Sequence, residues 1–180
     1  MRLVAIDGAG LVDENFFEFV VVYDPDGGFV TGGGKIESTE GAYSGDPTVT
    51  GTANFGFVSK YKKGSSVPEG NTNFKLKAGD LKFKAKEYSW LVVDADGERA
   101  RFRGTGTVNG QDGFEFVITV IDAANSPDTS TDLFRIQIWN EADGTVVYDN
   151  EMGSPEGADP TTEISGGSIV IHASNKKGPK

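Results

Sequence analysis

The alternation of apolar and charged residues between Phe74 and Ile121 is the feature that most constrains how this chain folds. A period of two places successive side chains on opposite faces of a β-strand, so that one face is buried and the other is solvated. In Lys82–Lys86 and Arg99–Arg103 every charged side chain on the solvated face is basic. The pattern predicts four consecutive strands with cations outside and aromatic rings inside. They are Phe74–Lys77, Lys82–Val93, Arg99–Val108 and Phe114–Ile121.

The rest of the chain continues the pattern of short strands separated by glycine- and proline-containing turns. No segment of ten or more residues has a helical pattern. About eleven strands at this spacing predict an all-β fold, namely a two-sheet antiparallel β-sandwich with no long helix. The seven further strands are expected at Met1–Ile6, Phe16–Tyr23, Phe29–Ile36, Gly51–Tyr61, Leu133–Trp139, Thr145–Tyr148 and Ser168–His172. Residues 29–174 form the predicted module, and residues 175–180 a frayed tail.

A triplet of glycines, Gly32–Gly34, lies inside the strand expected at Phe29–Ile36. A phosphate-binding loop would end in Gly-Lys-Ser/Thr and lead into a helix, and neither feature follows here. The triplet therefore predicts a bulged or tightly packed strand.

The charge of the chain is unevenly distributed. The net charge is −10, yet residues 60–103 contain 11 of the 17 Lys and Arg and only 6 of the 27 Asp and Glu. An acidic chain disfavours nucleic acid as a partner, whereas a basic stripe on an acidic protein favours association with an acidic partner. The stripe consists of Lys75, Lys77, Lys82, Lys84, Lys86, Arg99, Arg101 and Arg103.

Two interpretations of this basic stripe remain open. It can bind an acidic polysaccharide or an acidic protein surface, or it can be a solvated sheet face that keeps the protein soluble and discourages edge pairing. Among the aromatic residues, Trp139 faces away from Phe134, Ile136 and Ile138, so we expect an exposed ring that can stack on a sugar. Trp90 is expected in the core with Tyr88 and Val92.

Acidic loops and a single histidine are the residues on which metal binding or catalysis could depend. The loop that contains Asp122, Asp128 and Asp132 is the best candidate for Ca²⁺, which binds carboxylate and carbonyl oxygens. The chain has no cysteine and a single histidine, His172, and no nucleophile motif accompanies it. We therefore expect a protein that is not an enzyme. No apolar run is long enough to span a membrane, and the first residues do not form a signal peptide because the apolar run breaks at Asp7.

Several segments resemble the post-choice-of-anchor module found at the C-terminus of large secreted bacterial proteins. The resemblance extends from Phe29 to His172, and Lys35 departs from it where an aromatic residue is expected. The resemblance implies an extracellular or cell-surface module, in which residues 1–28 are the closing strands of a preceding immunoglobulin-like domain. An N-terminal β-arm is the alternative for these residues. The matching segments are Phe29–Gly34, Ala53–Gly64, Trp90–Val93, Gly104–Gly110, Phe134–Trp139, Val146–Asn150 and Gly166–His172.

These observations predict a non-catalytic extracellular module that binds an acidic glycan or a surface partner through its basic sheet face. The alternative is a structural subunit that forms a homo-oligomer or fibre by exchange of the apolar strand at residues 16–23. A glycoside-active enzyme is the more distant alternative, because two carboxylates suffice for that chemistry.

Overall fold

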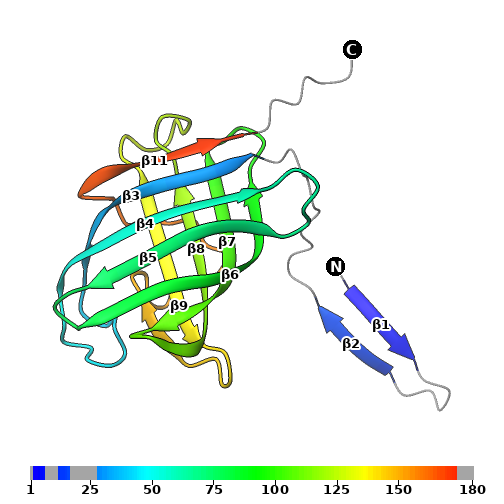
Figure 1. The fold of residues 1–180 in the computed structure, drawn as a ribbon, viewed down its shortest axis with the longest axis horizontal. Coiled ribbons are helices and arrows are strands. Elements are labelled where there is room, and N and C mark those ends of the chain that lie inside the picture. The colour runs from blue at the N-terminus through cyan, green and yellow to red at the C-terminus, as the bar shows by residue number, and fades with distance from the viewer. Residues whose placement is uncertain (1, 7–11, 17–27, 174–180) are drawn as a thin grey trace.

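The protein consists of β-strands in the computed structural model, which describes residues 2–6, 12–16 and 28–173 (Figure 1). Two strands, β1 (Arg2–Ile6) and β2 (Val12–Phe16), pair with each other. The other nine form one antiparallel sheet, in the order β10-β9-β8-β7-β6-β5-β4-β3-β11. Their bounds are β3 Phe29–Ser38, β4 Gly51–Tyr61, β5 Pro68–Leu76, β6 Leu81–Val93, β7 Arg99–Val108, β8 Gln111–Ile121, β9 Leu133–Asn140, β10 Val146–Asp149 and β11 Gly166–His172.

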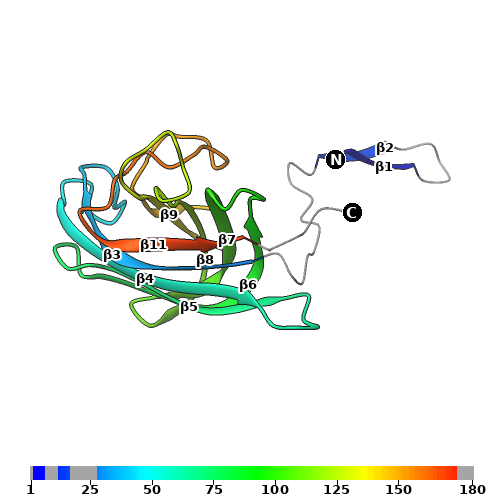
Figure 2. The same ribbon diagram turned by 90° about the horizontal axis from the view of Figure 1, so that it is seen from above.

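The nine-stranded sheet folds over itself, so that β7 to β9 lie behind β3 to β5 and cross them at a steep angle (Figures 1 and 2). Aromatic rings fill the space between the two halves. Phe55 of β4 stacks on Phe134 of β9 with ring centroids 4.0 Å apart, and Phe57 packs on Phe102 of β7 at 5.3 Å. The core is therefore formed by the inner face of a single folded sheet.

The junction between β5 and β6 explains why there is one sheet. These strands pair only at Asn73–Leu76 and Leu81–Lys84, and beyond this point they separate. Tyr hydroxyls bridge the gap: Tyr88 hydrogen-bonds Thr72 at 2.7 Å, and Tyr61 hydrogen-bonds both the N–H and the C=O of Leu91. The all-β prediction is confirmed for the described residues. The two-sheet sandwich is not confirmed, because this short hairpin joins both halves into one open sheet.

Both edges of the sheet are covered by loops. On β11, the backbone N–H groups of Ile169 and Ile171 donate to the carboxylates of Asp132 (2.7 Å) and Asp122 (2.9 Å). On β10, the N–H of Asp149 donates to the carbonyl of Ala42 at 2.9 Å. Covered edges protect a sheet from pairing with another chain.

The glycine triplet is a tightly packed strand, as predicted. A Cβ on Gly32 would lie 2.5 Å from the Phe57 ring, and one on Gly34 would lie 2.3 Å from the carbonyl oxygen of Gly166. These inward-facing positions leave room for the rings of Phe55 and Phe57, which are both buried. The absence of side chains at Gly32 and Gly34 therefore allows the two phenylalanine rings to pack in the core.

Strand positions agree well with the sequence analysis within residues 28–173. Gly51–Tyr61 and Arg99–Val108 have the predicted bounds. The prediction for β5 was too short, because the strand begins at Pro68 rather than at Phe74. Most of the strand predicted at Phe16–Tyr23 lies outside the described residues, as does the tail after residue 173. Among the described residues, no helix is long and apolar enough to cross a membrane.

Buried Tyr148 makes the fold sensitive to high pH. Burial raises its pKa from 10.0 to about 12, and its hydroxyl lies 3.0 Å from that of Ser38. A raised folded-state pKa means that the contribution is complete below pH 10 and is lost as the pH rises to 12. We expect roughly 2–3 kcal/mol to be lost over this range. Urea unfolding at pH 8, 10 and 11.5 measures it. The Tyr148→Phe variant should lose correspondingly less, and an equal loss in both proteins would contradict the assignment.

Candidate binding site

The basic stripe lies on the outer face of the sheet. Phe83 and Phe102 are buried, at 2% and 0% exposure, so the alternating residues on either side of them face outward. In the β6–β7 register, Lys84 lies opposite Thr107 and Arg101 lies opposite Val92. Lysines and arginines therefore share one face, as the alternation predicts. The two kinds of cation differ, however, in their ion pairs and in their exposure to solvent.

The arginine part of the stripe is neutralised within the chain. Arg99 contacts Asp159 at 2.6 Å and Asp94 at 3.2 Å. Arg101 pairs with Glu156 at 2.8 Å and also donates to the carbonyl of that residue. Glu156 and Asp159 belong to the acidic segment 151–163, which lies over these strands. Desolvation by burial lowers the pKa of Arg101 below its ordinary value, although Glu156 acts in the opposite direction.

The same segment is anchored by Arg135, which is also buried under it. The guanidinium of Arg135 makes two hydrogen bonds to the carboxylate of Asp149, at 3.1 and 2.9 Å. It also donates to the carbonyls of Pro155 (2.7 Å) and Ser154 (2.9 Å). Arg99, Arg101 and Arg135 thus bind the chain's own acidic segment, and within residues 28–173 each of them has a carboxylate partner.

Two irregularities in β6 change the faces of its aromatic residues. The register between β6 and β7 shifts between Ala85 and Glu87, and again between Tyr88 and Trp90. Tyr88 is therefore buried, whereas Trp90 lies on the outer face under the guanidinium of Arg101, 5.6 Å from its centroid. The prediction that Trp90 and Val92 share the core with Tyr88 was wrong, because each bulge reverses the alternation.

Trp139 lies on the outer face, as predicted, but it is partly covered. The Arg103 guanidinium lies 4.9 Å from the centre of its ring. The indole N–H donates to Glu115 at 2.9 Å, and Arg103 pairs with the same carboxylate oxygen at 2.9 Å. This cluster uses one face of the indole, so Trp139 is half-buried in an intramolecular contact.

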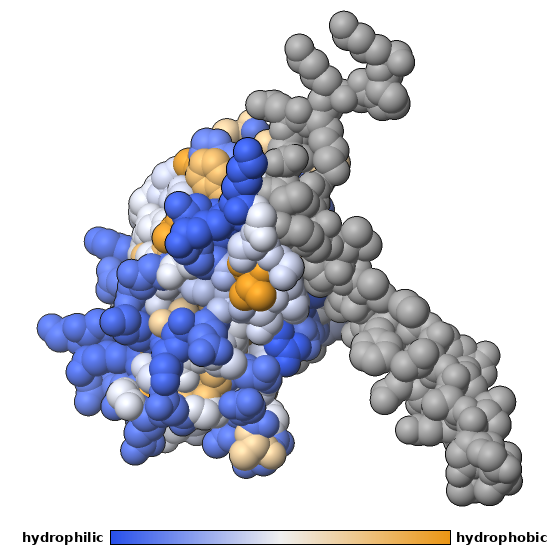
Figure 3. Space-filling model, turned by 45° about the vertical axis from the view of Figure 1, so that its right-hand side comes forward, coloured by the Kyte–Doolittle hydropathy of each residue, from blue (hydrophilic) through white to orange (hydrophobic). Residues whose placement is uncertain are grey.

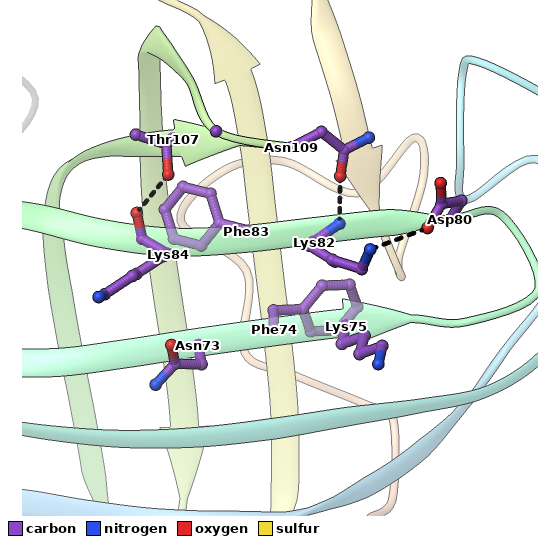
Figure 4. Close-up of a pocket in the computed structure, with 10 residues that line it drawn as sticks. Asn73, Phe74, Lys75, Asp80, Lys82, Phe83, Lys84, Thr107 and Asn109 are labelled. Carbon is purple, nitrogen blue, oxygen red and sulfur yellow. Dashed lines mark hydrogen bonds and ion pairs between the residues drawn. The ribbon is translucent and has the colours of Figure 1, made fainter.

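The lysine part of the stripe remains open to solvent and surrounds a shallow groove on β5, β6 and the β7–β8 turn (Figure 4). The groove has a volume of about 570 Å³, within the range of small-ligand sites. We call it the lysine groove. Its polar side chains are those of Asn73, Lys75, Asp80, Lys82, Lys84, Thr107 and Asn109.

Strand pairing positions the groups of the lysine groove. Lys75 lies opposite Lys82, and Asn73 lies opposite Lys84. The carboxylate of Asp80 pairs with the Lys82 ammonium at 3.2 Å. Neither Lys75 nor Lys84 has an ion pair with an acidic residue of the described ranges. The groove therefore presents three ammonium groups against one carboxylate.

The turns that border the groove fix its polar groups. Asn109 and Gly110 both have positive φ, 51° and 84°, and form the two-residue turn between β7 and β8 that an Asn-Gly pair favours. The side-chain oxygen of Asn109 accepts the backbone N–H of Lys82 at 2.8 Å. Asp80 also has a positive φ, 46°. Asn73 was not among the predicted binding residues, because the start of β5 was predicted too late, and neither was Asn109.

The remaining members of the predicted stripe lie near the groove or apart from it. Lys77 is exposed in the turn before β6. Lys86 is exposed at a β6 bulge and pairs with Asp112 at 3.0 Å. His172, the single histidine, stacks on Phe29 at 4.1 Å at the surface end of β11.

The residues predicted to bind Ca²⁺ do not converge on one point in the structure. Asp122 accepts backbone N–H groups from Ala124 and Ile171, and Asp132 accepts them from Ala123 and Ile169. Asp128 is exposed. No group of three or more acidic or histidine side chains that could hold a metal occurs within residues 28–173. The Ca²⁺ site stays a prediction, and the observed role of Asp122 and Asp132 is to cover the edge of β11.

Large apolar patches are absent from the face shown in Figure 3. Hydrophilic residues cover most of its described surface, and the hydrophobic ones form small, separate patches. The core of a protein–protein interface is typically apolar and depleted of charge. The surface in this view therefore favours a polar ligand.

In comparisons with known proteins, no family model, curated protein or solved structure matches the chain.

Proposed function

We propose that this chain is a non-catalytic, extracellular or cell-surface module that binds an acidic glycan through the lysine groove. The observation that carries the proposal is the contrast between the two parts of the basic stripe. The arginines are paired with Asp159, Glu156 and Glu115, whereas Lys75 and Lys84 face solvent without an acidic partner in the described part of the chain. Although the net charge of the chain is −10, a basic surface of this kind attracts an anionic ligand locally.

The covered sheet edges favour this proposal over assembly by strand addition. An incoming strand would have to displace Asp122 and Asp132 from β11, or the segment around Ala42 from β10. Each displacement would leave carboxylates or backbone groups without their present partners. Strand exchange through residues 16–23 concerns a segment that, apart from Phe16, lies outside the described residues.

Charge reversal in the groove tests the proposal. We expect the Lys75→Glu/Lys84→Glu variant to bind oligogalacturonate at least about tenfold more weakly than the parent, since 1.4 kcal/mol corresponds to tenfold and two attractive charges become repulsive. Calorimetry at about 0.05 M salt measures the affinity. Binding by the parent should weaken steeply toward 1 M salt, where the screening length falls to about 3 Å.

A matched control separates the groove from net charge. The Lys62→Glu/Lys63→Glu variant changes the net charge by the same amount in the β4–β5 connection, and Lys62 there already contacts Glu69. It should retain an affinity within about threefold of the parent. Equal weakening in both variants, or unchanged binding in the groove variant, would show that the lysine groove is not the site.

A further inference from the structure

We infer that the lysine groove selects sugar acids, with a carboxylate and free hydroxyls on the same ring, over sulfated or phosphorylated polymers. This inference rests on the proposed function and specifies the ligand of the same site. It derives from the mixture of groups in the groove. A surface built for dense anionic charge offers donors alone, whereas this groove also contains acceptors.

The ammonium groups of Lys75, Lys82 and Lys84 supply the attraction for an anion. Adjacent strands lie about 4.8 Å apart, so Lys75 and Lys82, which are opposite each other, can reach one carboxylate between them. Lys84 is two residues further along β6, on the same face. The groove can therefore hold one or two separate negative charges.

Asp80 is the acceptor that restricts the ligand. Its carboxylate lies at the rim of the groove beside Lys82, at 3.2 Å from the ammonium (Figure 4). Sulfate and phosphate esters bring several oxygens with little or no donor capacity, so a neighbouring carboxylate repels them. A sugar hydroxyl is a donor as well as an acceptor, and it can donate to this carboxylate.

Neutral polar groups complete a surface suited to hydroxyls. Asn73, Thr107 and Asn109 border the groove, and amides and hydroxyls both donate and accept hydrogen bonds. The Asn73 amide donates to Asn71 at 3.0 Å, which fixes its orientation on the outer face. An acidic peptide has carboxylates but lacks ring hydroxyls, so it would use the lysines alone.

The experiment compares four probes of equal length at constant ionic strength: oligogalacturonate, dextran sulfate, polyphosphate and poly-glutamate. We expect the parent protein to bind oligogalacturonate at least about fivefold more tightly than each of the others. In Asp80→Asn, dextran sulfate should bind at least about fivefold more tightly than to the parent, so that the preference narrows. Asparagine readily adopts the positive φ of position 80, so the turn is maintained.

Asp112→Asn is the matched control. It also removes a carboxylate that pairs with a β6 lysine, here Lys86 at 3.0 Å, but this pair does not line the groove. It should change each affinity by less than about twofold. Equal or tighter binding of any other probe by the parent, or an unchanged preference in Asp80→Asn, would overturn selection of sugar acids. If that binding still depended on Lys75 and Lys84, the anion-binding groove itself would stand. Absence of binding to all four probes would overturn both proposals.

Discussion

Replacing Asp149 by alanine is expected to lower the free energy of unfolding by about 3–5 kcal/mol, the usual result of removing one partner from a buried ion pair. Asp149 and Arg135 have side chains that are each 3% exposed. The carboxylate accepts two hydrogen bonds from the guanidinium and another from the backbone N–H of Glu151. Alanine would leave a buried cation with only the carbonyls of Ser154 and Pro155. Urea unfolding monitored by tryptophan fluorescence measures the change.

Two further variants test the cause of this loss. Asp159→Ala removes one of the two carboxylates that pair with Arg99 at the surface, so it should cost about 1 kcal/mol or less. In Arg135→Met/Asp149→Leu both charges are replaced by apolar groups, and most of the lost stability should return. A double variant as unstable as Asp149→Ala would show that packing or backbone contacts, rather than the unpaired charge, cause the loss.

The Arg135–Asp149 pair also bears on the lysine groove. It holds the beginning of the acidic segment 151–163, whose Glu156 and Asp159 neutralise Arg101 and Arg99. If that segment is displaced, the arginines become available and the basic surface extends from β6 to β7. Measurements of glycan binding by Asp149 variants therefore need to be read together with their stability.

The sequence predicted the strands with regular alternation, but it did not predict the bulges that interrupt the alternation in β6. The bounds of Gly51–Tyr61 and Arg99–Val108 could be predicted because uninterrupted alternation sets them residue by residue. The bulges in β6 could not, since a bulge leaves no distinct signal in an alternating segment. Each shifts the alternation by one residue, so the first turns Tyr88 inward and the second returns Trp90 to the outer face, away from the Tyr88 side chain with which it was predicted to pack.

The site was predicted in part for a related reason. Lys75, Lys82 and Lys84 share the outer face because of their spacing in neighbouring strands, which is visible in the sequence. The pairing of Arg99 and Arg101 with residues 60 and 55 positions later depends on the course of segment 151–163. A charge pattern alone cannot show which cations the chain neutralises itself. The single folded sheet likewise depends on the four-residue pairing of β5 with β6.

Phe134→Ala is expected to have an equally large effect on stability, because this ring joins the two halves of the folded sheet. Phe134 is fully buried and stacks on Phe55 with ring centroids 4.0 Å apart and an angle of 9° between the planes. Truncating a buried phenylalanine costs about 3–5 kcal/mol through lost transfer energy and the cavity that remains. A domain is usually stable by only about 5–15 kcal/mol, so this loss would bring the protein close to unfolding at room temperature.

Phe29→Ala provides the comparison within the same sheet. Phe29 is 37% exposed and stacks on His172 at the surface end of β11, so its truncation should cost about 1 kcal/mol or less. Urea midpoints should separate the two variants while the slope of the unfolding transition stays unchanged, because the slope follows the surface exposed on unfolding. A loss below about 1 kcal/mol in Phe134→Ala would mean that the crossing of β9 behind β4 does not hold the sheet closed over its core. Stability would then reside in the strand ladders, and the curvature that places β5 and β6 around the lysine groove would need another cause.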